Sequence, residues 1–320
     1  MAFVPPPGYL PSYNPPLPYV APVPGGLWPG MAVYVQGVVT PQAEWFRVNL
    51  AAGPQEEADV ALHVNPRFGA GLAVLNSRRG GHWGDERRRE LQPLCQGGAF
   101  EMVISVTPEG YRILVNGTFY EEFPHRLPPE QVTAVNVDGD LELHSASVLG
   151  GGGAFPPCVP DAPQVTPSYP DCNLPVMGQP PTLHPPVPFI ATIPGGLIPK
   201  KTIVIKGFVP HHANRFYINL RAGAGGDVVL HLNPRMDEDN AVVRNALLGG
   251  TWGPEERDLP CCSPFQRGCY FDLSIRCGNH RFKVFVQGQP LFDFHHRVPA
   301  GPHVDVLEIE GDVVLSYVHF

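Results

Sequence analysis

The sequence predicts an all-β protein built from two tandem antiparallel β-sandwiches, and three observations lead to this prediction. The 320 residues include 40 Pro and 35 Gly, about 23% of the chain, which opposes a helical bundle. Hydrophobic residues nevertheless make up 43%, enough for packed cores. Finally, the pattern of the first half returns about 170 residues later in the second half.

The internal repeat is clearest in two motifs. Segment 14–27 (NPPLPYVAPVPGGL) returns as 184–197 (HPPVPFIATIPGGL), and segment 59–67 (DVALHVNPR) returns as 227–235 (DVVLHLNPR). The spacing between copies varies by only a few residues, so insertions are confined to loops. One domain has therefore been duplicated in tandem.

Two segments lack a hydrophobic period and are rich in Pro, which favours extended backbone. They are the start of the chain and the stretch between the copies. We therefore expect four parts: a Pro-rich tail (1–18), an N-terminal domain (19–150), a Pro/Gly-rich linker (151–190) and a C-terminal domain (191–320).

Within each copy, short segments alternate apolar and polar residues, as strands with one buried face do. Asn116-Gly117 and Gln287-Gly288 punctuate the last pair of segments in the manner of hairpin turns. Many short strands without a convincing helix are typical of an antiparallel sandwich. The clearest expected strands are 31–39, 100–106 and 111–115 in the first copy and 202–209, 271–275 and 281–286 in the second.

Composition excludes several classes of function. The net charge is −8, with 22 Lys and Arg against 30 Asp and Glu, which argues against nucleic-acid binding. No stretch approaches the roughly 20 apolar residues of a membrane span, so we expect no membrane insertion. The first residues lack the features of a signal peptide, and seven Cys without a C-x-x-C pair favour a reducing compartment. We therefore expect synthesis in the cytoplasm.

A row of polar side chains marks one strand in each copy. Alternation places three of them on one face, roughly 6.6 Å apart along the strand. They are His63, Asn65 and Arg67 in the first copy and His231, Asn233 and Arg235 in the second. Alone, such a row reads as a solvated outer face. Its presence in both copies, while neighbouring surface positions differ, favours a function.

A second repeated cluster follows each row. A Trp preceded by Gly-Gly-His or Gly-Gly-Thr and followed by Gly is poorly placed for deep burial, so we expect an exposed ring rather than a core Trp. Glu and Arg two residues apart share a strand face and can pair. The cluster comprises Asn76, Trp83, Glu86 and Arg88 in the first copy and Asn245, Trp252, Glu255 and Arg257 in the second.

Together, the polar row, the exposed ring and the Glu–Arg pair match the chemistry of a sugar. The apolar face of a galactose-like ring can lie on an aromatic ring, while its hydroxyls both donate and accept hydrogen bonds. A site built to bond one hydroxyl discriminates strongly against a ligand that lacks it.

The motif H-x-N-P-R, then N, then W-G-x-E-x-R resembles the galectin signature, and both copies match it completely. The resemblance covers nearly the whole chain and is to the tandem-repeat members of the family. It implies a jelly-roll fold for each domain and β-galactoside ligands such as lactose and N-acetyllactosamine. The segments between the polar row and the next Asn, 68–75 and 236–244, differ in length by one residue, which leaves fine specificity open.

The resemblance also implies roles for the first set of residues, and the second set should act alike. His63, Asn65 and Arg67 would hold the galactose 4-hydroxyl, with Asn76 and Glu86 at the 6-hydroxyl. Trp83 would stack on the ring, and Glu86 with Arg88 would reach the neighbouring sugar.

Two such domains imply a lectin that crosslinks galactose-containing glycans of glycoproteins and glycolipids. The resemblance places this action outside the cell, after secretion that needs no signal peptide. The sequence leaves self-association open.

The two copies differ in the charge around the site. Five arginines surround the first site (78, 79 and 87–89), and six acidic residues surround the second (237–239, 255, 256 and 258). The first site is therefore expected to favour sulfated or sialylated galactosides. The alternative interpretation is solvated loop charge.

Other functions fit less well. Glycoside hydrolysis usually needs two facing carboxylates, whereas each motif offers one Glu beside an Arg, so we predict no enzyme and no catalytic residues. A His-x-Asn pair beside Arg is hostile to a cation, so we predict no metal site, and we expect no cofactor. The main alternative is an intracellular protein–protein adaptor whose Pro-rich tail and linker bind aromatic grooves.

Overall fold

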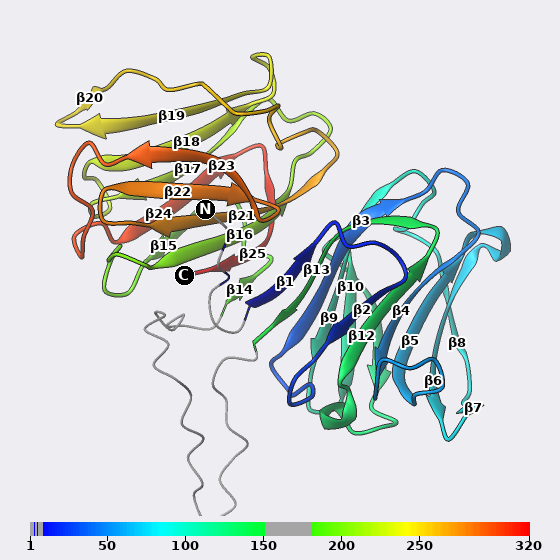
Figure 1. The fold of residues 1–320 in the computed structure, drawn as a ribbon. Coiled ribbons are helices and arrows are strands. Elements are labelled where there is room, and N and C mark those ends of the chain that lie inside the picture. Colours follow the sequence, from blue (N-terminus) through cyan, green and yellow to red (C-terminus); the bar gives the residue numbers. More distant parts are fainter. Residues whose placement is uncertain (1–2, 4, 6–8, 151–180) are drawn as a thin grey trace, which may run out of the picture. The chain divides into compact units, whose positions relative to one another are not determined.

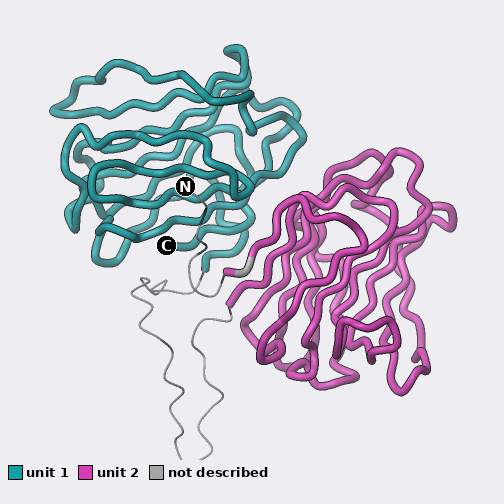
Figure 2. Tube along the Cα trace, viewed as in Figure 1, with its two compact units in different colours: residues 1–8, 152–320 teal, residues 9–151 magenta. Residues whose placement is uncertain are grey.

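In the computed structural model the chain is all-β, as predicted. The structure describes residues 3, 5, 9–150 and 181–320. Residues 9–150 form one compact unit, and residues 181–320 together with Phe3 belong to a second (Figures 1 and 2). Each unit contains two antiparallel sheets, in agreement with the predicted jelly-roll sandwiches.

The N-terminal unit has a six-stranded and a seven-stranded sheet. In spatial order, the first contains β1 (Tyr9–Tyr13), β13 (Leu141–Leu149), β3 (Ala32–Val39), β9 (Ala99–Val106), β10 (Gly110–Val115) and β11 (Thr118–Pro124). The second contains β2 (Tyr19–Pro22), β12 (Ala134–Gly139), β4 (Phe46–Ala51), β5 (Val60–Arg67), β6 (Leu72–Arg79) and β7 (His82–Trp83), with β8 (Arg87–Glu90) also paired to β6. Two short 3₁₀ helices, η1 (Phe68–Ala70) and η2 (Pro129–Gln131), lie in connections.

The C-terminal unit repeats this order. Its first sheet contains β14 (Thr182–Leu183), β25 (Val314–His319), β16 (Thr202–Phe208), β21 (Tyr270–Cys277), β22 (Arg281–Val286) and β23 (Gln289–His295). Its second contains β15 (Phe189–Thr192), β24 (Val306–Gly311), β17 (Phe216–Arg221), β18 (Val228–Arg235), β19 (Ala241–Leu248) and β20 (Thr251–Trp252). In place of a strand like β8, the C-terminal unit has an isolated bridge between Arg244 and Glu256.

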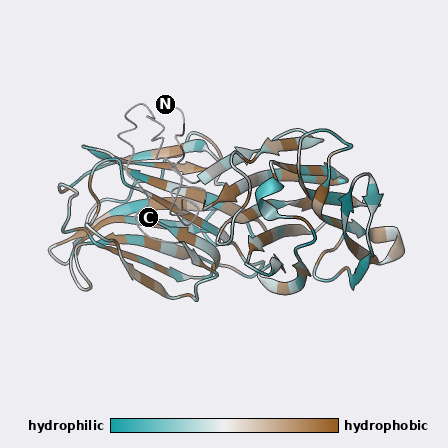
Figure 3. Ribbon diagram, turned by 90° about the horizontal axis from the view of Figure 1, so that it is seen from below, coloured by the Kyte–Doolittle hydropathy of each residue, from teal (hydrophilic) through white to brown (hydrophobic). Residues whose placement is uncertain are grey.

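Alternation of apolar and polar residues explains why these segments are strands (Figure 3). In β9, Phe100, Met102 and Ile104 face the core of the N-terminal unit. The six strands expected most clearly from the sequence lie within two residues of their predicted bounds. Both predicted hairpin turns are also confirmed, because Asn116-Gly117 and Gln287-Gly288 have the positive φ angles of a two-residue turn.

The start of the chain differs from the prediction. Residues 1–18 were expected to be a tail, but β1 begins at Tyr9 and pairs with β13. The pattern misled because Pro11 lacks an N–H donor, which an edge strand such as β1 tolerates. Of the expected linker 151–190, residues 151–180 lie outside the described residues, while β14 falls in its last part and pairs with β25. No helix in the described ranges is long and apolar enough to cross a membrane.

Candidate functional sites

The first polar row lies on β5, in the middle of the seven-stranded sheet of the N-terminal unit. Leu62 and Val64 point into the core, and His63 is half-buried on the opposite face, as the alternation predicts. β4 and β6 flank β5, and in this register His63 lies opposite Asn49 on one side and Asn76 on the other. The sheet therefore supplies side chains from three adjacent strands to one surface.

His63 is held as a neutral hydrogen-bond acceptor. Its Nδ1 lies 2.7 Å from Asn49 Oδ1, an atom that can only accept, so Nδ1 carries the proton and Nε2 keeps its lone pair. Burial, together with the nearby positive charges of Arg47, Arg67 and Arg78, lowers the pKa of His63 to about 4. The ring is therefore uncharged at neutral pH.

Asn65 and Arg67 are fixed by each other. The Asn65 amide donates to the Phe46 carbonyl at 2.6 Å and is only 7% exposed. Its oxygen accepts a bond of 2.7 Å from Arg67 Nε. No described carboxylate forms an ion pair with Arg67, so both of its Nη groups are left to donate to a ligand.

Asn76 anchors the turn that leads to the second cluster. Its Nδ2 donates to the Gly84 carbonyl at 2.9 Å, and its Oδ1 accepts from the Ser77 amide at 2.8 Å. Arg126 Nη1 approaches the same oxygen at 3.3 Å. A Cβ at Gly84 would lie 3.0 Å from that nitrogen, so glycine provides the room for this arginine.

Trp83 and the Glu–Arg pair complete the first site. The indole is 49% exposed, which confirms the expectation of an exposed ring, and its centroid lies 4.8 Å from that of His63. The guanidinium carbon of Arg78 lies 5.5 Å from the indole centroid. Glu86 accepts from Arg88 Nη2 at 2.9 Å, so the predicted pair also forms.

The second site repeats these contacts. His231 Nδ1 lies 2.7 Å from Asn219 Oδ1, and burial, followed by the charge of Arg235, lowers the pKa of His231 to about 4. Trp252 is again 49% exposed and 4.8 Å from the histidine ring. The remaining bonds of the second site join Asn233 to Phe216 O (2.6 Å), Arg235 to Asn233 (2.7 Å), Asn245 to Gly253 O (2.9 Å) and Arg257 Nε to Glu255 (2.9 Å).

The ion pairs of the two sites differ. Arg235 Nη1 contacts Glu238 at 2.9 Å and its Nη2 contacts Glu255 at 2.8 Å. Arg257 contacts the same two carboxylates, so two arginines and two glutamates form a closed cluster. These contacts lower the pKa of Glu238 and Glu255, with hydrogen bonds from Arg257 as the leading cause.

The surface beside each histidine differs as well. In the first site a groove of about 280 Å³ extends from His63 and Trp83 over β4 and β12, and it includes Arg47 and Arg78. Arg78 Nε is buried there without a hydrogen-bond partner. In the second site Leu247 occupies the strand position of Arg78. Arg78 pairs with Val60 at the start of β5, and Leu247 pairs with Val228 at the start of β18. Glu308 accepts bonds from Asn219 and Arg221 on the same surface.

The arginines expected around the first site have different partners. Arg78 contacts Trp83, and Arg88 pairs with Glu86. Arg87 and Arg89 instead pair with Glu121 of β11. Strand alternation explains the difference, because Arg87 and Arg89 point to one face of β8 and Arg88 points to the other.

Sequence reasoning missed the residues that orient the site. Asn49 and Asn219 orient the histidines, and Arg126 and Arg297 bond the oxygens of Asn76 and Asn245. A sequence signal was available for each pair. The two asparagines lie in the repeated motif F-x-x-N-L, and the two arginines lie in the repeated motif F-x-H-R. Among the described residues, no group of three or more His, Cys, Asp or Glu is placed to hold a metal ion.

Comparison with known proteins gives a consistent result. The family model described as "Galactoside-binding lectin" matches residues 18–148 and 188–320. Galectin-4 of Homo sapiens is 49% identical over 327 residues, and Galectin-4 of Sus scrofa is 50% identical over 327 residues, each alignment covering 99% of both chains. Among solved structures, the Caenorhabditis elegans galectin LEC-6 is 32% identical, with a TM-score of 0.40, over 43% of this chain and 94% of that one.

Proposed function

The chain belongs to the family of galactoside-binding lectins, and we propose that each of its domains binds one terminal β-galactoside through its polar row and its exposed Trp. It is thus a lectin with two carbohydrate-recognition domains and not an enzyme. The observation that carries the assignment of residues is the recurrence of the same hydrogen bonds in both domains. A neutral His acceptor, an Arg donor and an exposed indole converge twice.

The contacts support a specific mode of binding. The galactose 4-hydroxyl would donate to His63 Nε2 and accept from Arg67 and Asn65, which supply an acceptor and donors on one surface. Asn76 and Glu86 would bind the 6-hydroxyl, and the apolar sugar face would lie on Trp83. Glu86 with Arg88 would reach the next sugar. An epimer with its 4-hydroxyl elsewhere would leave His63 and Arg67 unpaired, which opposes its binding.

Calorimetry on the full chain tests this mode. Arg67→Ala and Arg235→Ala should each reduce the number of lactose sites from two to one, and the double variant should bind none. Arg112→Gln, on the other sheet of the N-terminal domain, is the matched control and should keep both sites. Two intact lactose sites in the double variant would contradict the assignment.

We also propose that the first site prefers galactosides with a sulfate or sialic acid. Among the described residues Arg67 has no carboxylate partner there, and Arg78, which lies beside Trp83, donates to the backbone carbonyls of Glu56 and Ala58 and to no carboxylate. In the second site, Glu238 and Glu255 neutralise the arginines, and Leu247 replaces Arg78. With the other site disabled, each site should be titrated with lactose and 3′-sulfolactose at low and high salt. Equal preference in both sites would end this proposal.

Two sites on one chain support a crosslinking function. Bivalent attachment can raise apparent affinity by about 10²–10⁴ when the geometry permits. We propose that the protein bridges glycans of glycoproteins and glycolipids outside the cell, since such glycans are displayed there. Cells should agglutinate with the intact chain and not after cleavage within residues 151–180. To test the location, the protein is detected on the surface of unpermeabilised cells, and lactose should elute it.

The adaptor alternative has a narrower basis. Residues 9–13 of the expected tail pair with β13, so they cannot serve at the same time as an extended ligand for an aromatic groove. We therefore do not extend this alternative.

A further inference from the structure

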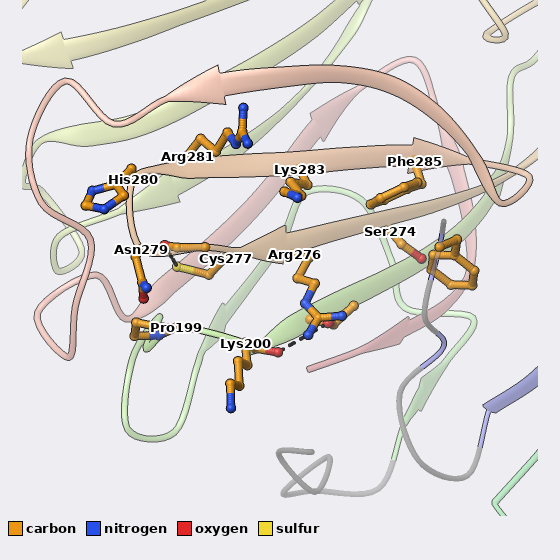
Figure 4. Close-up of a pocket in the computed structure, with 13 residues that line it drawn as sticks. Pro199, Lys200, Ser274, Arg276, Cys277, Asn279, His280, Arg281, Lys283 and Phe285 are labelled. Carbon is orange, nitrogen blue, oxygen red and sulfur yellow. Dashed lines mark hydrogen bonds between the residues drawn. The ribbon is translucent and has the colours of Figure 1, made fainter. Parts of the chain in front are cut away.

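The sheet of the C-terminal domain that does not contain β18 has a cationic pocket on its outer face (Figure 4). The pocket has a volume of about 460 Å³ and is formed by β16, β21 and β22 with the segment before β16. Phe3 also lines it, with its ring centroid 5.5 Å from that of Phe285. Four lining residues are basic: Lys200, Arg276, Arg281 and Lys283. None of the described residues that line it is an Asp or Glu. The chain as a whole is acidic, so this positive charge is a local feature.

Two of these cations lie side by side. In the register of β21 and β22, Arg276 is directly opposite Lys283. Side chains in such positions have Cβ atoms about 4.5–5.5 Å apart, and like charges there are destabilising. Arg281 precedes Lys283 by two residues on the same face of β22 and forms an ion pair with Asp293 at 3.0 Å. Asp293 of β23 also lies directly opposite Lys283. Arg276 and Lys283 both line the pocket, and Figure 4 shows them side by side there.

Lys200 adds a third cation at an unfavourable backbone position. Its φ is +77°, in the left-handed region that side chains with a Cβ rarely adopt. At the equivalent place in the N-terminal domain the residue is Gly30, with φ +92°. Both positions are fixed by the same bond, from their amide to the carbonyl of Val106 or Cys277. A Lys in this conformation is a strained feature, and such features are concentrated at functional sites.

The N-terminal domain supplies an internal comparison. Ser105 is opposite Arg112 there, where the C-terminal domain has Arg276 opposite Lys283. In the next turn, the Glu109 carbonyl accepts from the His125 amide as the His280 carbonyl accepts from the His296 amide. Glu109 therefore occupies the position of His280. The N-terminal domain keeps a single cation, Arg112, at the position of Lys283, with Ser105 and Gly30 in place of Arg276 and Lys200. The fold therefore does not require the full set of cations.

We propose that this pocket binds a ligand that carries at least two sulfate or phosphate groups. Tetrahedral oxyanions accept several hydrogen bonds, and the Arg fork binds them in a bidentate manner. The spacing of about 5 Å across strands and roughly 6.6 Å along them allows separate anionic groups to meet separate cations. Sulfated oligosaccharides and polyphosphorylated inositols share this chemistry. Because β18 lies in the other sheet, the ligand would bind independently of the galactoside.

Calorimetric titration of the full chain with saturating lactose tests the proposal. The probes are a heparin tetrasaccharide and inositol hexakisphosphate, which separate sulfate-bearing from phosphate-bearing sources. We expect at least one to bind at one site per chain. The Arg276→Ser/Lys283→Gln variant should lose about tenfold in affinity and keep both lactose sites. Arg112→Gln is the matched control from the N-terminal domain and should change nothing.

A second variant guards against misfolding. Lys200→Gly copies the residue of the other domain, so it should keep or raise the unfolding temperature while weakening the polyanion. The proposal is overturned if neither probe binds, if the double variant binds with unchanged affinity, or if lactose displaces the probe.

Discussion

The two proposed carbohydrate sites share the groups that we expect to bind hydroxyls, and they differ in their charge. In the N-terminal site Arg67 has no described carboxylate partner and Arg78 lies beside the indole. In the C-terminal site Glu238 and Glu255 each pair with Arg235 and Arg257. Leu247 stands there at the position of Arg78. Duplication has therefore preserved the part of the site that we propose contacts the neutral sugar. Under the same proposal, residues outside the repeated motif set the response to charged substituents.

The largest expected effect tests the shared part. Trp83→Ala and Trp252→Ala should each weaken lactose by about 2 kcal/mol, roughly 30-fold, because the apolar face of the sugar loses its contact. The two losses should be equal, since both rings are 49% exposed and equally distant from the histidine. Calorimetry with the other site disabled measures them. A tenfold difference between the two losses would show that the sites are not equivalent even for a neutral ligand.

Acid should act on both sites with the same midpoint. The pKa of His63 and of His231 is about 4, so each ring accepts a hydroxyl above that pH and cannot below it. Lactose affinity should fall by about tenfold for each pH unit below the midpoint. Calorimetric titrations across pH measure it for each site. Midpoints more than one unit apart would show that Glu255 and Glu308 alter the second histidine enough to separate the sites.

The same shifts have a consequence for stability. Both folded-state pKa values lie below the ordinary value of 6.5. The unfolded chain therefore takes up these protons first, and stability should be lost as the pH falls from about 6.5 to about 4. Thermal unfolding measured over this range should show the decline. An unfolding temperature that rose on acidification would contradict the burial of neutral histidines.

Exchange of the residue beside the indole should exchange the charge preference. Arg78→Leu should weaken 3′-sulfolactose at the first site by about tenfold, as expected for a lost charged hydrogen bond. Its lactose affinity should change by less than about twofold. The reciprocal Leu247→Arg should strengthen the sulfated ligand at the second site. If lactose and 3′-sulfolactose weaken equally in Arg78→Leu, the residue supports the ring and does not select the anion.

The smallest effect concerns the ion cluster of the second site. Glu238→Gln removes one of two carboxylates shared by Arg235 and Arg257, so it should raise affinity for 3′-sulfolactose there by about two- to fivefold. The exposed position of the cluster keeps the effect small. Measurement at low salt, with the first site disabled, resolves it. Unchanged affinity at low salt would show that the ion pairs do not limit the charge preference.

Sequence reasoning worked best where the strand period decided the outcome. Alternation placed His63, Asn65 and Arg67 on one face, and the structure confirms this placement. The neighbouring glycines predicted the exposed Trp83, which the structure also confirms. Sequence reasoning did not anticipate that Arg87 and Arg89 would point to the opposite face of β8 from Arg88 and pair with Glu121. It also failed at β1, where Pro11 resembled a tail residue and edge pairing with β13 was not visible from composition.

The orienting residues were missed for a different reason. Asn49 belongs to β4 and Arg126 follows β11, so each reaches the site only through sheet pairing and sandwich packing. Their repeated motifs identified them as constrained and did not identify their partners. The cationic pocket shows the same limit, since Arg276 and Lys283 become neighbours only when β21 pairs with β22.

The sequence alone determined the all-β class, the duplication and the identity of the repeated sugar-binding motif. These depend on local period and on recurrence along one chain, which need no knowledge of contacts. Tertiary structure decided which charges meet. Glu238 neutralises Arg235 and Arg257, while Glu121 removes Arg87 and Arg89 from the first site. Electrostatic interaction depends on separation in space, and a folded sheet sets that separation independently of distance along the chain.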